Sequence, residues 1–229
     1  MRLSVHRSAC VSGVALAAAL ALYAAPARAG EPYVHDGFQF RGAVGFGFIS
    51  TSTSDNSSVH GGDGNFELYF GGMPIRGLAI GGFISDVYAP NPGFTADNGA
   101  ATVTVSDSNT SLNLFTVGPY VDWYPRAHEG LHILGTLGYA NVKISTSQGD
   151  FSASSSAGGV TIGGGVGYDW WVGRDWSIGI LGRLTYAHTS QTVATGAVVS
   201  VNGANVASGD VTVSQDTIAP EILFSFSFN

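Results

Sequence analysis

The stretch from Gly159 to Thr189 alternates between large apolar residues and small or charged residues, in two segments joined by a short turn. This period of two is typical of β-strands, because successive side chains of a strand point to opposite faces. The apolar face ends in aromatic residues at the turn, which suits a strand with lipid on one side and a polar lumen on the other. The stretch therefore predicts one hairpin of a transmembrane β-barrel. Its large residues are Val160, Ile162, Val166, Tyr168, Trp170, Trp176, Ile178, Ile180, Leu184 and Tyr186.

The same alternation recurs along the chain and predicts eight strands in all. Short turns near residues 75, 127 and 174 alternate with long polar connections over 50–64, 89–110, 145–158 and 189–213. Outer-membrane barrels have this asymmetry, with short periplasmic turns and long extracellular loops. We therefore predict an all-β fold, an eight-stranded antiparallel up-and-down transmembrane barrel. Six further strands are expected besides the hairpin. Three have both bounds, 38–49, 65–73 and 214–228; of the others, one begins at 78, one ends at 124 and one begins at 131.

Residues 1–29 have the pattern of a secretory signal peptide, so the barrel is expected to occupy residues 30–229. A basic start precedes an apolar run at 11–25 and a small-residue cleavage site at Ala27–Ala29. Cys10, the single cysteine, falls in this segment, so no disulfide is expected in the mature chain.

The composition favours a membrane barrel over the alternative of a soluble secreted β-protein. It is 45% hydrophobic and 11% charged, whereas soluble domains are about 25% charged. The net charge of -7 argues against nucleic acid as a partner.

Charged residues within the predicted strands fall on the lumen face. The exception is Asp86, which the alternation places on the lipid face at the outer end of the third strand. A basic residue facing lipid at mid-membrane would cost about 2–4 kcal/mol. Arg41, Glu67, Arg183 and Glu221 lie on four strands that become neighbours when the barrel closes, with alternating sign. We predict that they form one ion network that plugs the lumen. The alternative is a gate or constriction in a narrow channel for small solutes or ions.

A second polar group is expected at the periplasmic mouth, formed by Asp122, His132 and Asp169. Asp122 and His132 lie low on adjacent strands and are expected to pair through a hydrogen bond; an acid–base or metal pair is the alternative. No third ligand or nucleophile accompanies them, so no catalytic residue, metal site or cofactor is predicted. Five aromatic residues cluster at the same end and predict an interfacial girdle: Trp123, Tyr124, Trp170, Trp171 and Trp176.

Two prolines and one dipeptide modify this scheme. Pro119 and Pro220 fall inside predicted strands, where each removes a ladder hydrogen bond, so β-bulges are expected there. Asn202-Gly203 is expected to turn a small hairpin within the last long connection.

With these features the sequence resembles the small outer-membrane β-barrel proteins of Gram-negative bacteria, the OmpA/OmpX-type eight-stranded superfamily. The ending Phe224-Ser-Phe-Ser-Phe228 is similar to the signal read by the barrel-assembly machinery, although Asn229 follows the last phenylalanine. The run from Gly167 to Trp171 also looks like generic members of these families.

The resemblance implies an outer-membrane location, surrounding lipid and lipopolysaccharide, and assembly by the barrel-assembly machinery. Members of the superfamily include structural anchors, adhesins, narrow pores and a few lipid-modifying enzymes. We expect a non-enzymatic structural or surface-interaction role with four displayed loops, through which an extracellular ligand could bind. A narrow channel is the alternative function.

Overall fold

The computed structural model describes residues 33–54, 57–97, 102–106, 109–148, 151–193, 199–201, 204–206 and 211–229. The predicted signal peptide and the expected Asn202-Gly203 turn lie outside the described residues. Eight long strands build the wall: β1 (Gly37–Thr53), β2 (Ser57–Ile75), β3 (Leu78–Pro90), β6 (Thr110–Trp123), β7 (Leu131–Gln148), β8 (Phe151–Trp171), β9 (Trp176–Val193) and β12 (Val211–Phe228). Four short strands accompany them: β4 (Gly93–Asp97), β5 (Thr102–Ser106), β10 (Val199–Val201) and β11 (Ala204–Val206).

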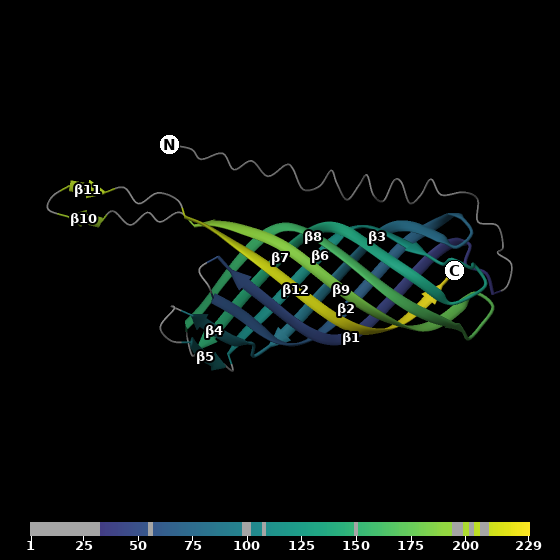
Figure 1. The fold of residues 1–229 in the computed structure, drawn as a ribbon, viewed down its shortest axis with the longest axis horizontal. Helices are drawn as coiled ribbons and strands as arrows, with labels where there is room; N and C mark the ends of the chain where they lie inside the picture. The colour runs from purple at the N-terminus through teal and green to yellow at the C-terminus, as the bar shows by residue number, and fades with distance from the viewer. Residues whose placement is uncertain are drawn as a thin grey trace.

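The eight long strands close into an antiparallel barrel (Figure 1). Each long strand pairs with its neighbours in the order β1-β12-β9-β8-β7-β6-β3-β2, and β1 also pairs with β2, which completes the ring. The closing seam is long, because β1 and β12 stay in register from Phe40 opposite Phe228 to Thr53 opposite Gln215. The predicted fold class is thus confirmed.

The strands run further than the alternation of large apolar residues predicted. β1 and β2 are in register out to Ser52 opposite Ser58, within residues expected to form a loop, and β7 and β8 pair as far as Gln148 opposite Phe151. The serine- and threonine-rich segments keep a period of two without large apolar residues, and threonine favours extended backbone. The ladder therefore continues above the lipid-facing band, where the β4–β5 hairpin pairs with the start of β2.

The bulges expected at the two prolines are absent from the described ladders. Pro119 lies opposite Gly82 and Pro220 opposite Leu184, each in an unshifted register. Proline has no backbone N–H group, so it removes one hydrogen bond from the ladder, and this loss does not require the extra residue that defines a bulge. The register shift that is present lies between Gly72 and Ile75, next to a short turn.

The outward faces are those the alternation predicted. Phe46, Leu137 and Phe224, for example, are 60%, 60% and 54% exposed, as expected for side chains in contact with lipid. No helix in the described part of the chain is both long and apolar enough to cross a membrane.

The lumen is packed with side chains in the manner of a soluble protein core. One buried apolar cluster fills the half nearer the long connections, and a second fills the half nearer the short turns. The outer cluster comprises Ile49, Val59, Val87, Ala89, Leu112, Leu114, Ala140, Val142, Ala187 and Ala219. The inner cluster comprises Ala43, Tyr69, Ala79, Phe83, Tyr120, Leu134, Leu181 and Leu223. Buried charged groups accompany these clusters and form the candidate site.

Candidate functional site: the charged lumen

The first charged group surrounds Arg41, which β1 directs into the lumen near the short-turn end. Its Nη1 lies 2.9 Å from Asp122 Oδ2 on β6, and its Nη2 lies 2.7 Å from Asp169 Oδ2 on β8. All three side chains are at most 1% exposed. One guanidinium thus crosses the lumen and bridges two carboxylates, a geometry for which its fork of donors is suited. We call these residues, with His132 and Tyr124, the Arg41 cluster.

Tyr124 and His132 complete the hydrogen bonding of this cluster. Arg41 Nη2 donates to the Tyr124 hydroxyl over 2.5 Å, and that hydroxyl donates to Asp169 Oδ2 over 2.8 Å. His132 Nδ1 lies 2.8 Å from Asp122 Oδ1, so the pair expected at the periplasmic mouth is present in the geometry. Buried charges persist when they are both paired and hydrogen-bonded, and this cluster meets both conditions.

Gly179 on β9 provides the space that Asp169 occupies. A Cβ atom at position 179 would meet Asp169 Oδ1 and, at 2.8 Å, the Ser225 hydroxyl. Only the absence of a side chain there lets the carboxylate lie against the backbone of the neighbouring strand. Gly179 thus helps to position the first charged group.

The second charged group lies between strands β9, β2 and β12. Arg183 forms an ion pair with Glu67 and donates to the Tyr69 hydroxyl over 3.1 Å. Glu67 also accepts hydrogen bonds from Tyr69 at 2.6 Å and from the Asn65 amide at 2.7 Å. Glu221 lies directly opposite Arg183 in the β9–β12 register.

The expected single network of Arg41, Glu67, Arg183 and Glu221 is therefore wrong. The two arginines belong to separate groups, because Arg41 forms its ion pairs across the lumen with Asp122 and Asp169. Arg41 lies nearer the short-turn end of its strand than Glu67 and Arg183 do of theirs. Arg41, which was expected in the wall network, instead joins Asp122, His132 and Asp169 in the cluster at the periplasmic mouth.

The aromatic girdle holds three of the five expected residues. Trp123, Trp170 and Trp176 face outward and are 49%, 49% and 40% exposed. Tyr124 faces the lumen instead and is 2% exposed, and Trp171 packs with its ring centroid 4.5 Å from that of His35 below the mouth. Both corrections follow from strand parity, since neighbouring residues of one strand cannot both face lipid.

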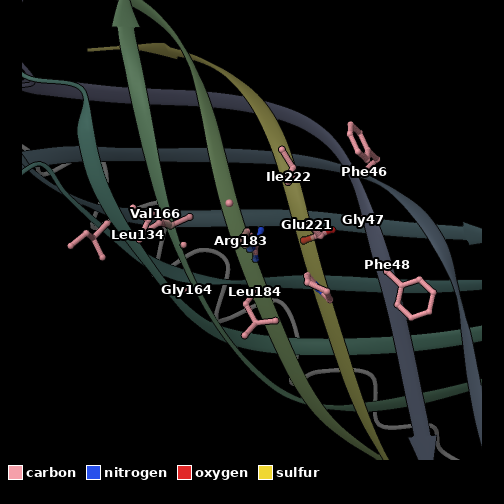
Figure 2. Close-up of a pocket in the computed structure, with 14 residues that line it drawn as sticks. Phe46, Gly47, Phe48, Leu134, Gly164, Val166, Arg183, Leu184, Glu221 and Ile222 are labelled. Atoms are coloured by element: carbon pink, nitrogen blue, oxygen red, sulfur yellow. The ribbon is translucent and has the colours of Figure 1, made fainter.

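A groove lies in the wall where β7, β8, β9, β12 and β1 run side by side (Figure 2). Gly164 and Gly182 lower the surface there, and apolar side chains border it, so hydrocarbon chains of lipid are its natural contact. Figure 2 also shows Arg183 and Glu221 close together on neighbouring strands behind this surface. The bordering apolar residues include Phe46, Phe48, Ile133, Val166, Leu184 and Ile222.

Chemically, the Arg41 cluster and the Arg183–Glu67 pair are each arranged for mutual neutralisation. Each carboxylate of the Arg41 cluster already contacts a cation or a hydroxyl donor. In the part of the chain that the structure describes, no three histidine, cysteine, aspartate or glutamate side chains are grouped so as to hold a metal ion.

Replacing Tyr124 by phenylalanine is expected to reduce the free energy of unfolding by about 1.5–3 kcal/mol, the range for hydrogen bonds to charged groups. The change removes a hydroxyl that accepts from Arg41 and donates to Asp169, while the ring that packs on His35 is kept. Urea unfolding of protein folded in lipid vesicles measures it. An unchanged midpoint would mean that the hydroxyl adds nothing to the ion pairs.

Comparison with known families gives the barrel its identity. The family model of the autotransporter beta-domain matches residues 92–217, which is more than half of the chain. The chain belongs to the autotransporter beta-domain family. As a member of this family with a closed eight-stranded barrel, it is an integral protein of the Gram-negative outer membrane.

Solved structures similar to this autotransporter beta-domain protein are outer-membrane barrels of low sequence identity. Ail of Yersinia pestis, solved with the heparin analogue sucrose octasulfate, is 11% identical with a TM-score of 0.47; the match covers 82% of this chain and 99% of Ail. OprG of Pseudomonas aeruginosa is 14% identical with a TM-score of 0.45, over 87% of this chain and 100% of OprG. Neisserial surface protein A is 12% identical with a TM-score of 0.42, over 80% and 95%. No curated protein matches the chain.

Proposed function

We propose that this protein is a non-enzymatic barrel with a permanently closed lumen, which acts as a rigid scaffold for surface interactions. The observation that carries the proposal is the filling of the lumen by alternating ionic and apolar layers. The Arg41 cluster, the inner apolar cluster, the Arg183–Glu67 pair and the outer apolar cluster together occupy the barrel from mouth to rim.

This packing favours a plug over a conducting constriction. Ion-selective constrictions keep charged side chains in contact with water so that ions can enter and leave. Here Arg41, Glu67 and Arg183 are 1%, 0% and 4% exposed, and the outer apolar cluster covers them from the long-connection side. Their ion pairs therefore satisfy buried charges and fix the strands in one arrangement.

The strand extensions above the lipid-facing band are the candidate contact surface. β2 continues outward to Ser57, where it carries the β4–β5 hairpin, and β7 and β8 continue to Gln148 and Phe151. A closed barrel holds these extensions rigidly, and a preorganised surface binds a partner with less loss of conformational entropy. An extracellular ligand bound through these elements, and delivery by the barrel-assembly machinery through the outward Phe224 and Phe226, belong to this proposal.

Conductance of refolded protein in a planar bilayer tests the plug. We expect no channel activity from the wild type and none from an Arg183→Ala, Glu221→Ala variant, because both apolar clusters remain. A Phe46→Leu variant on the lipid face serves as the matched control, and a heat-dependent gel shift verifies folding of all three. Channels in the wild type would establish the narrow-channel alternative. Channels in the double variant alone would mean that one ion pair, and not the layered packing, closes the lumen.

A further inference from the structure

The segment Tyr33–Asp36, which precedes β1, crosses the periplasmic mouth and is bonded to all three short turns. We call it the N-terminal strap. Its residues are outside the strands, yet Val34 and His35 are 3% and 0% exposed. The backbone hydrogen bonds are Tyr33 N–H to Arg174 O (3.1 Å), His35 N–H to Ala127 O (2.8 Å) and Gly77 N–H to His35 O (2.9 Å).

The side chain of His35 is the part of the strap that enters the mouth. Its ring stacks on Tyr124 with 3.6 Å between centroids, and Trp171 packs against it at 4.5 Å. Tyr124 in turn stacks toward His132 and bonds to Arg41. The imidazole thus lies in an aromatic slot directly beneath the Arg41 cluster.

This slot favours the neutral imidazole. Burial lowers the pKa of His35 from 6.5 to about 4, and the Arg41 cation adds to the lowering. The Asn229 side chain, Asp169 and Asp122 oppose it and raise the pKa in part. His132 and Tyr124 face the same slot as ring partners.

From this geometry we propose that the N-terminal strap is a latch on the periplasmic mouth, released when His35 gains a proton. Release would withdraw the imidazole from between Tyr124 and Trp171, break the backbone bonds to the three turns and uncover the Arg41 cluster. The strap is thereby a peptide ligand held in cis by a site made of the short turns and one aromatic slot.

The sign of the pH dependence follows from the direction of the shift. A released strap binds a proton at the ordinary histidine pKa, whereas a docked strap resists it until about pH 4. Docking is therefore complete at neutral pH and weakens as the pH falls through the window between 6.5 and 4. Between pH 7 and pH 4 the docking equilibrium should fall by about 100-fold, since each unit of pKa difference is a factor of ten.

Nuclear magnetic resonance of the labelled full-length barrel in lipid nanodiscs tests the latch. The reporter is the amide of Gly77, which donates to His35 when the strap is docked. In the wild type we expect this signal and the His35 ring signals to move together between pH 6.5 and 4. A His35→Phe variant keeps an aromatic ring in the slot but cannot titrate, so its Gly77 signal should stay at the docked position throughout.

His128 lies exposed in the β6–β7 turn and provides a matched control, because it is a histidine at the same mouth that does not belong to the strap. A His128→Phe variant should keep the acid transition unchanged. The proposal is overturned if His35→Phe retains the transition, if His128→Phe abolishes it, or if the wild-type Gly77 signal does not move. None of these outcomes depends on whether the lumen conducts.

Discussion

Replacing Arg41 by methionine is expected to reduce the free energy of unfolding by about 3–5 kcal/mol, the usual loss when one partner of a buried ion pair is removed. Methionine keeps an unbranched apolar stem along the first part of the arginine path, so the main change is the loss of the guanidinium. What remains is a pair of buried carboxylates, Asp122 and Asp169, that share the same cluster and have lost their common cation.

Urea unfolding of refolded protein in vesicles, followed by tryptophan fluorescence, measures this loss. A matched variant combines Arg41→Met with Asp122→Asn and Asp169→Asn, which removes both charges while it keeps their shapes. This triple variant should regain a large part of the stability, because the penalty comes from uncompensated charge. If the triple variant is as unstable as Arg41→Met alone, the hydrogen-bonding geometry of the guanidinium matters more than the charge balance.

Replacing Ile222 by arginine is expected to destabilise the barrel by about 2–4 kcal/mol, the value for a basic residue on the lipid face at the membrane midplane. Ile222 faces outward with 49% exposure and lies near the middle of β12, opposite Gly182 on one side and Phe46 on the other.

The matched control for Ile222→Arg is Ser52→Arg, at an outward position near the outer end of β1. An arginine at the membrane edge should cost only about 0–1 kcal/mol, because its guanidinium reaches the interface. Equal losses at both positions would contradict the placement of the lipid band along the strands. Folding in vesicles of defined thickness, with the unfolding midpoint in urea as the readout, distinguishes the two.

The faces of the strands could be predicted from sequence because a period of two admits just two assignments, and lipid selects one. Phe224, Phe226 and Ile218 are outward, as expected, because exchanging the faces would place Glu221 in hydrocarbon. The extent of the ladders could not be predicted so well. Serine and threonine continue a strand without marking a face, so the apolar pattern ended several residues before the hydrogen bonds did.

The partners of the charged residues were harder to predict than their faces. Whether Arg41 contacts Glu67 or Asp169 depends on the stagger between neighbouring tilted strands around the barrel. This stagger is a property of the closed sheet and cannot be predicted from the sequence of one strand. Clustering in sequence predicts Tyr124 and Trp171 in the girdle, but each follows an outward tryptophan, Trp123 or Trp170, so alternation directs it away from the lipid face. His35 carried no signal, since it precedes the first alternating segment.

The three turns held by the N-terminal strap belong to hairpins that are far apart in the chain. The β2–β3, β6–β7 and β8–β9 turns reach their places beneath one mouth only when β1 has met β12 and the ring is complete. The strap can therefore make all three of its backbone bonds only on a closed ring, so its docking distinguishes a finished barrel from an open sheet.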